Sequence, residues 1–176
     1  MVWAILNPEQ NAALKEIVDT QSDRVAAILG GAMLDDSLRR ALEHRLRPHD
    51  NINDKLFRVT GALGNTVPKI DLAFLLYMFE KPVRNTMYGI AEVRNCFAHN
   101  MSLKLDDDYK RLNDAFSKMT AHVNREYYTL PNGVVSTDLP IEPTTSRRAH
   151  YVVSLKLCLI DLMADFNRHQ PHSCAV

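Results

Sequence analysis

The segment EVRNCFAHN, residues 92–100, places three polar side chains that could do chemistry inside an apolar, helix-forming stretch. Asn95 and His99 are four residues apart, so a helix puts them on one face. Arg94 lies about 100° around the helix from Asn95, at the edge of that face. If the helix frays at Ala98, His99 can swing towards Arg94, and both can then act on one group.

An arginine and a histidine placed in this way suit phosphate chemistry. An imidazole titrates near physiological pH, whereas a guanidinium stays charged and can hold a phosphate through two hydrogen bonds. In this pattern His99 is the expected general acid or base, Arg94 the phosphate anchor and Asn95 the residue that orients the group or the histidine. The reaction would be cleavage of RNA by the ribose 2′-hydroxyl, which needs no metal and no cofactor.

A structural interpretation of the same three residues is equally open. Asp71 lies in the preceding apolar segment and needs a cationic partner, because an unpaired buried carboxylate is costly. Either Arg94 or Arg84 can supply that partner. Asn95 can then bond a neighbouring helix end, and His99 can sit at a helix C-terminus, where a cation is favoured.

The composition limits the classes of protein that the chain can belong to. Its 176 residues are 46% hydrophobic and 24% charged, which fits a soluble globular protein. Lys+Arg and Asp+Glu both number 21, and this zero net charge argues against direct DNA binding, although a local basic patch stays open. The N-terminus has no signal-peptide pattern, and no apolar run reaches membrane-spanning length. Cys96, Cys158 and Cys174 form no CxxC pair, so we expect a reduced, cytoplasmic protein.

The elements that must position these residues are predicted to be helices. The hydrophobic spacing predicts an all-α bundle of five to six helices in one domain, residues 1–170, followed by a flexible tail, residues 171–176. An arm at about 127–147, flexible or hairpin-like around Asn132-Gly133, precedes the last helix. The expected helices begin at Pro8 after an Asn7 cap, and then cover Ser22 to Leu46, Val67 to Phe79, Pro82 to His99 or Asn100, residues 105–127, and residues 146–169.

The loop before the Asp71 helix has its own pattern. Gly61 and Gly64 frame a tight loop, and Thr66 is the expected N-cap of the helix, which is apolar on most sides and therefore expected to be buried. Before it, residues 55–57 are expected to form one short helical turn. Gly30-Gly31, inside the second helix, predicts either a kink or a close helix contact.

Other polar groups are weaker candidates. His169 and His172 could bind a metal, but a solvated tail accounts for them better. The acidic run 106–108 is explained by a helix N-terminus. Arg147-Arg148 fits a solvated helix start better than an RNA contact. No phosphate-binding glycine loop and no convincing helix-turn-helix is present, and we assign no metal site and no cofactor.

Two motifs together resemble a known family. RNCFAHN is similar to the R-N-x-x-A-H signature of the HEPN superfamily of all-α domains. GALGNTVPKIDLAFLLYMF, followed ten residues later by IAEVRNCFAHN, more closely resembles the mannitol operon repressor (MtlR) family, which has a Gly-x-Leu-Gly loop, an IDLA helix and then IRN-FAH. The resemblance covers about residues 25–100, and the last third of the chain carries no matching motif.

The resemblance implies an all-helical fold and two possible functions. The MtlR family implies a regulator of sugar-alcohol operons without its own DNA-binding motif, which would act through a protein partner. The HEPN superfamily implies a homodimer whose arginine and histidine motifs meet across a two-fold interface, and a ribonuclease in which Arg94, Asn95 and His99 are catalytic. We therefore expect a non-enzymatic regulator first, with Asp71, Gly61 and Gly64 as structural or partner residues. The alternative is a metal-independent endoribonuclease that binds RNA.

Overall fold

The chain folds as an all-α bundle, which confirms the predicted fold class. The computed structural model describes residues 8–120, 128–129, 135–136 and 146–168. Seven helices lie within these residues, where five to six were expected, because the short turn predicted near residue 55 is a full helix of eight residues. The helices are α1 Pro8–Asp19, α2 Asp23–Arg45, α3 Asp50–Phe57, α4 Thr66–Leu75, α5 Lys81–His99, α6 Lys110–Lys118 and α7 Arg147–Arg168.

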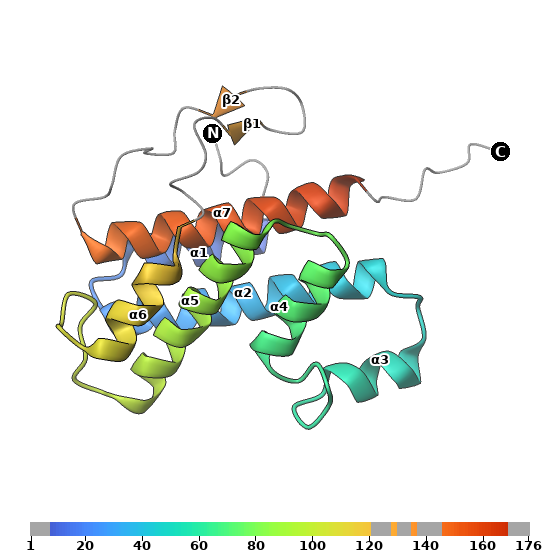
Figure 1. The fold of residues 1–176 in the computed structure, drawn as a ribbon, viewed down its shortest axis with the longest axis horizontal. Coiled ribbons are helices and arrows are strands. Elements are labelled where there is room, and N and C mark those ends of the chain that lie inside the picture. Colours follow the sequence, from blue (N-terminus) through green and yellow to red (C-terminus); the bar gives the residue numbers. More distant parts are fainter. Residues whose placement is uncertain (1–7, 121–127, 130–134, 137–145, 169–176) are drawn as a thin grey trace.

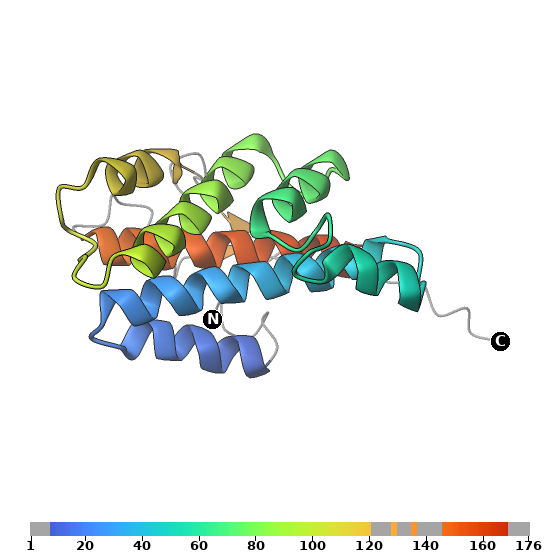
Figure 2. The same cartoon turned by 90° about the horizontal axis from the view of Figure 1, so that it is seen from below.

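The two longest helices, α2 and α7, lie side by side and run in the same direction (Figures 1 and 2). An ion pair joins them at each end. Arg148 Nη1 lies 3.2 Å from Asp23 Oδ1 at the N-terminal ends, and Arg45 Nη1 lies 2.9 Å from Asp165 Oδ1 at the C-terminal ends. Asp165 is only 1% exposed, so its pairing with Arg45 is needed to hold a buried charge. These contacts fix both the direction and the register of the pair.

Arg147 and Arg148 are structural, which corrects the expectation of a solvated helix start. Arg147 Nη1 donates to the carbonyl oxygens of Leu105, at 3.1 Å, and of Asp107, at 3.0 Å. Arg148 Nη2 donates to the carbonyl oxygen of Thr20, just after α1. The two guanidinium groups therefore tie the start of α7 to the end of α1 and to the loop before α6.

The Gly30-Gly31 pair of α2 is a site of close helix contact. The side chain of Tyr151 in α7 lies against Gly30, where an added Cβ would be 2.5 Å from the tyrosine oxygen. That hydroxyl is fully buried and donates to the carbonyl oxygen of Ala27 at 3.1 Å. The stem of Arg94 in α5 lies against Gly31, where an added Cβ would be 2.5 Å from Cγ of the arginine. The helix α2 runs through both glycines, so the close-contact interpretation is confirmed.

Gly61 and Gly64 close the C-terminal end of α3. The Gly61 amide donates to the carbonyl oxygen of Arg58 at 2.7 Å. An added Cβ on Gly61 would lie 2.2 Å from the carbonyl oxygen of Lys55, and one on Gly64 would lie 2.5 Å from that of Arg58. Any side chain at these two positions would thus collide with the backbone, which explains glycine at both.

The start of α4 differs by one residue from the expectation. Asn65 is the N-cap, and Thr66 is the first helical residue, whose hydroxyl donates to Asp35 Oδ1 of α2 at 2.8 Å. The second oxygen of Asp35 is 2.6 Å from Nζ of Lys69, a lysine that is only 2% exposed. The Thr66 hydroxyl therefore bonds a side chain of α2 and does not cap its own helix.

The end of α4 corrects a second expectation. The helix stops at Leu75 instead of Phe79, because Tyr77 adopts the left-handed backbone conformation with φ 57°. Leu75 is 70% exposed and Tyr77 is 92% exposed. The expectation that this apolar helix is buried on all sides is wrong, and only one of its faces packs into the core.

The acidic run 106–108 was expected to lie in the first turn of a helix. It lies instead in the loop before α6. Asp107 Oδ2 accepts a hydrogen bond from the Lys104 amide at 2.8 Å, and Asp108 Oδ1 accepts one from Asn113 Nδ2 at 2.7 Å. Two of the three carboxylates therefore organise the loop. The helix α6 ends at Lys118, earlier than expected, and residues 121–127 lie outside the described part of the chain.

Two short strands occupy the region of the expected arm. β1 Tyr128–Thr129 pairs with β2 Val135–Ser136 in antiparallel register, as a hairpin requires. The expected Asn7 cap, the Asn132-Gly133 turn and the tail at 171–176 fall outside the described residues. Within the described part, no helix is both long enough and apolar enough to cross a bilayer.

Candidate functional site

All three residues of the arginine–histidine motif lie on α5. This helix begins after the Glu80 cap with a proline in its first turn, as expected. Its buried face packs into the core with residues that recur at helical spacing: Val83, Met87, Ile90, Val93 and Phe97. The motif residues are left on the remaining surface, so burial of the apolar face sets the direction in which they point.

The motif residues are accessible to solvent. Arg94 and His99 are exposed, and Asn95 is partly exposed. Arg94 Nη1 donates to Asn95 Oδ1 at 3.2 Å, which draws the guanidinium towards the Asn95 side of the helix. The stem of Arg94 rests on Gly31 of α2. The arginine is therefore held along its apolar carbons, and its charged end faces water.

The helix continues through His99, as expected, so the fraying at Ala98 that would let His99 swing towards Arg94 does not occur. The amide of Asn100, the C-cap, donates to the carbonyl oxygen of Cys96 at 3.1 Å. The Asn100 side chain then accepts a hydrogen bond from the Ser102 amide at 3.2 Å, which stabilises the turn after the helix. Because they are five positions apart on an unbroken helix, Arg94 and His99 leave the axis about 140° apart.

Asp71 pairs with Arg84, so the open choice between Arg84 and Arg94 is settled. Arg84 Nη2 lies 2.7 Å from Asp71 Oδ1, and the Tyr88 hydroxyl donates to the same oxygen. The guanidinium of Arg84 also lies over the rings of Phe74, at 4.9 Å, and Tyr88, at 5.0 Å. These four residues join α4 to α5 in one polar and aromatic cluster, which leaves Arg94 out.

The charges of this cluster shift the pKa values of its members. The Tyr88 hydrogen bond, followed by the one from Arg84, holds the pKa of Asp71 below its ordinary value. Burial and the neighbouring carboxylate raise the pKa of Tyr88. Asp71 is therefore a stable carboxylate and Tyr88 a neutral hydroxyl at neutral pH. The expectation of a deeply buried carboxylate is wrong, because the Asp71 side chain is 43% exposed.

Cys96 lies between the motif residues in sequence but faces inward. It is 2% exposed, and burial followed by the nearby Glu92 carboxylate raises the pKa of its thiol. Glu92 itself pairs with Arg111 of α6, with Oε1 to Nη2 at 2.6 Å. A neutral, buried thiol is a poor nucleophile, so Cys96 contributes packing to this site and no covalent chemistry.

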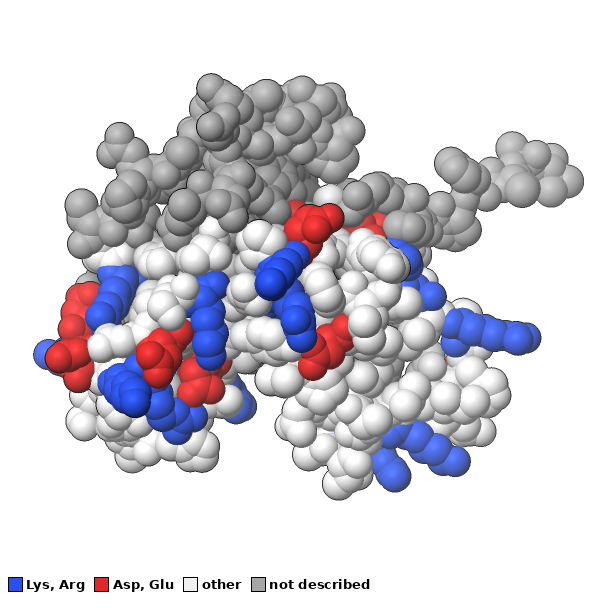
Figure 3. Space-filling view, viewed as in Figure 1, with Lys and Arg blue, Asp and Glu red and all other residues white. Residues whose placement is uncertain are grey.

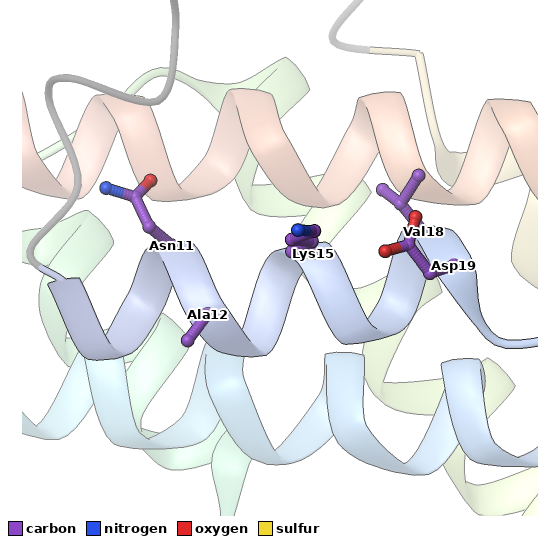
Figure 4. A pocket seen from close by; sticks show the side chains of 5 residues that line it. All are labelled: Asn11, Ala12, Lys15, Val18 and Asp19. Atoms are coloured by element: carbon purple, nitrogen blue, oxygen red, sulfur yellow. The ribbon is translucent and has the colours of Figure 1, made fainter.

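Three hollows of the described surface lie away from the motif. One, of about 550 Å³, lies against one face of α1 and is lined by Asn11, Ala12, Lys15, Val18 and Asp19 (Figure 4). A second, of about 280 Å³, lies between α1, α2 and α7, and a third, of about 330 Å³, lies between α2 and α3. The motif residues line none of these three, and Arg94 and His99 are exposed on the surface of α5.

The motif surface has the chemistry of a binding site for an anionic group. Among the residues that the structure describes, Arg94 forms no ion pair and is hydrogen-bonded only to the neutral side chain of Asn95. Its positive charge can therefore pair with a carboxylate or a phosphate of a ligand. His99 can donate or accept a hydrogen bond at the helix end. Gly61 and Gly64, the other predicted residues, act through the backbone at the end of α3 and are structural.

Sequence reasoning missed the role of Tyr88. It is the largest cause of the lowered pKa of Asp71 and joins that carboxylate to Arg84. Its four-residue separation from Arg84 is a signal that was present in the sequence, because residues four apart on a helix are neighbours. Arg84 and Asp71 lie in different helices, so their separation in the sequence does not indicate that they are neighbours.

Replacing Asp71 with asparagine tests the cluster. A lowered folded-state pKa means that the carboxylate stabilises the fold above its unfolded pKa, and that this stabilisation is lost as the pH falls through the folded value. We expect Asp71→Asn to lower the melting temperature at about pH 7 and the difference to shrink towards about pH 3. The effect should be a few degrees at most, because the side chain is half exposed.

The control is Asp114→Asn, which removes an exposed aspartate of α6. Its melting temperature should follow the wild type at both pH values. Equal melting temperatures of the wild type and Asp71→Asn at neutral pH would mean that the Asp71–Arg84–Tyr88 cluster contributes nothing to the fold.

Comparison of the chain with protein-family models, with curated proteins and with solved structures found no match.

Proposed function

We propose that the chain is a non-enzymatic regulator of the MtlR type, which acts by binding a protein partner through the exposed polar face of α5. The order and spacing of the GALGN loop, the IDLA helix and the RNCFAHN segment support the comparison with that family. The all-α bundle agrees with it. A homodimer, in which two such faces would be presented together, belongs to the same proposal.

The observation that carries this proposal is the direction of the two exposed side chains. Arg94 and His99 leave an unbroken helix about 140° apart, so within one copy they do not converge on one phosphate. A general acid or base must come within hydrogen-bond reach of the group on which it acts. Two side chains that diverge in this way suit separate contacts across a broad partner surface.

The surface charge also supports a protein partner. Lysine and arginine alternate with acidic residues over α5 and α6 on the face shown in Figure 3, and the chain as a whole has no net charge. Mixed charges of this kind give specificity between proteins, whereas tight, nonspecific binding to DNA needs a field of one sign. The unpaired Arg94 charge favours a carboxylate on the partner, because a guanidinium can hold both of its oxygens.

The direct test is the effect of Arg94→Ala on partner binding. Tagged chain is expressed in cells that naturally contain the protein, and the co-purifying proteins are quantified. We expect a partner that the wild type retains and that Arg94→Ala binds roughly tenfold more weakly or more, as is typical of a central interface arginine. Arg47→Ala, which removes an exposed arginine after α2, is the matched control and should retain it. Equal retention by both variants would contradict the proposal.

The alternative is a metal-independent ribonuclease of the HEPN type. The accessibility of both Arg94 and His99, and the lack of a carboxylate on Arg94 among the described residues, favour it. Since the two side chains diverge within one copy, Arg94 of one copy would hold the phosphate while His99 of the other transferred the proton. Asn95 would orient the arginine to which it is bonded.

RNA cleavage separates the two functions. Purified wild type and His99→Ala are incubated without metal with mixed-sequence RNA, and the products are tested for 2′,3′-cyclic phosphate ends. We expect no cleavage by the wild type beyond that of the variant, because the imidazole and the guanidinium of one copy do not converge. Cleavage that His99→Ala loses while its melting temperature is unchanged would establish the ribonuclease and overturn the regulator.

A further inference from the structure

A basic hollow between α2 and α3 lies apart from the α5 surface. It has a volume of about 330 Å³ and is lined by Arg39 of α2, by Asp54 and Lys55 of α3, and by Arg58, which follows α3. The lining therefore holds three cations and one carboxylate, and Glu43 beside it pairs with Arg39.

The sequence shows the same local excess. Residues 39–58 contain six Lys or Arg and three Asp or Glu. Arg40 pairs with Asp36 and Arg45 pairs with Asp165, so the excess that bears on the hollow is carried by Lys55 and Arg58. A hollow with cationic walls raises the local concentration of anions beyond what separate surface charges achieve. Zero net charge left a local basic patch open, and Arg39, Lys55 and Arg58 form a small one at this hollow.

Arg39 is held in place before any ligand binds. Its Nε donates to Glu43 Oε1 at 2.8 Å, and its guanidinium lies over the Phe57 ring at 5.5 Å. Phe57 is only 4% exposed, so the ring is a fixed support. An arginine that is already oriented loses less conformational freedom when it binds an anion, which favours a defined site over a diffuse patch.

Arg58 is also fixed, through its backbone. Its amide donates to the carbonyl oxygen of Asp54 at 3.1 Å, and its own carbonyl accepts the Gly61 amide at 2.7 Å. The backbone of Gly64 packs so closely on the same carbonyl that a Cβ there would be 2.5 Å away. The GALG loop thus places the third cation at the rim of the hollow, in addition to ending α3.

We propose that this hollow binds the phosphate group of a small molecule. Arginine forks and a lysine are the side chains that proteins use to hold phosphate oxygens, and the volume is at the low end for a small-molecule site. The negative charge of Asp54 repels the phosphate and so limits the affinity of the hollow for it. The site is independent of the α5 surface, so the failure of either proposal leaves the other standing.

The test is a titration of the full chain with methyl phosphate, followed by the amide resonances in NMR spectra. We expect saturable shifts confined to residues around 39 and 54–58. Arg58→Ala and Lys55→Ala should each weaken binding roughly threefold to tenfold, because each removes a charge-assisted contact. Asp54→Ala should tighten it, since a like charge is removed. Lys118→Ala, an equal loss of charge on an exposed residue of α6, should leave binding unchanged.

Several outcomes would overturn the site. Shifts that do not saturate, or weakening by Lys118→Ala equal to that by Arg58→Ala, would show only general attraction by positive charge. Unchanged or weaker binding by Asp54→Ala would contradict the assigned geometry. A single-stranded oligonucleotide that binds the same residues far more tightly than methyl phosphate would assign the site to nucleic acid instead. Arg58, Lys55 and Asp54 are exposed, so unchanged melting temperatures should accompany all three variants.

Discussion

Two adjacent glycines of α2 are the constraint on which both the fold and the candidate site depend. Gly30 leaves room for the Tyr151 ring of α7, and Gly31 leaves room for the stem of Arg94 of α5. A side chain at either position would force one of these helices away. The buried tyrosine fixes α7 against α2, and the ion pairs at both ends of α2 and α7 then set their common direction. The same helix surface that closes the core therefore also supports the exposed arginine.

The site inherits its properties from this arrangement. Because α5 is packed along its apolar face and continues to His99, the directions of the motif side chains are fixed by the helix. Arg94 lies outside the Asp71–Arg84–Tyr88 cluster, so its charge is available to a partner. At the other end of α2, Arg39 and the α3 loop build a second cationic site. One long helix thus supports two separate surfaces.

Much of the fold was predictable from the sequence, because local patterns decide it. The start of α2 at the Ser22 cap, the start of α5 beside Pro82 and the span of α7 follow from caps and hydrophobic spacing. The errors occurred where distant contacts decide the outcome. Thr66 is bonded by Asp35 of another helix, Arg147 binds carbonyls 40 or more positions away, and the exposure of Leu75 depends on which neighbours pack against α4. The motif residues themselves were found from the sequence. That Arg94 and His99 point in different directions could be seen only from the structure, in which α5 continues unbroken to His99.

The central claim is that Arg94 and His99 act as separate contacts of one binding surface. A double-mutant cycle on partner affinity, with Arg94→Ala, His99→Ala and the double variant, tests it most directly. Side chains that diverge by about 140° should give additive losses, within about 0.5 kcal/mol. A coupling energy above about 1 kcal/mol would mean that both act on one group, as residues of a catalytic unit do, and would contradict the account.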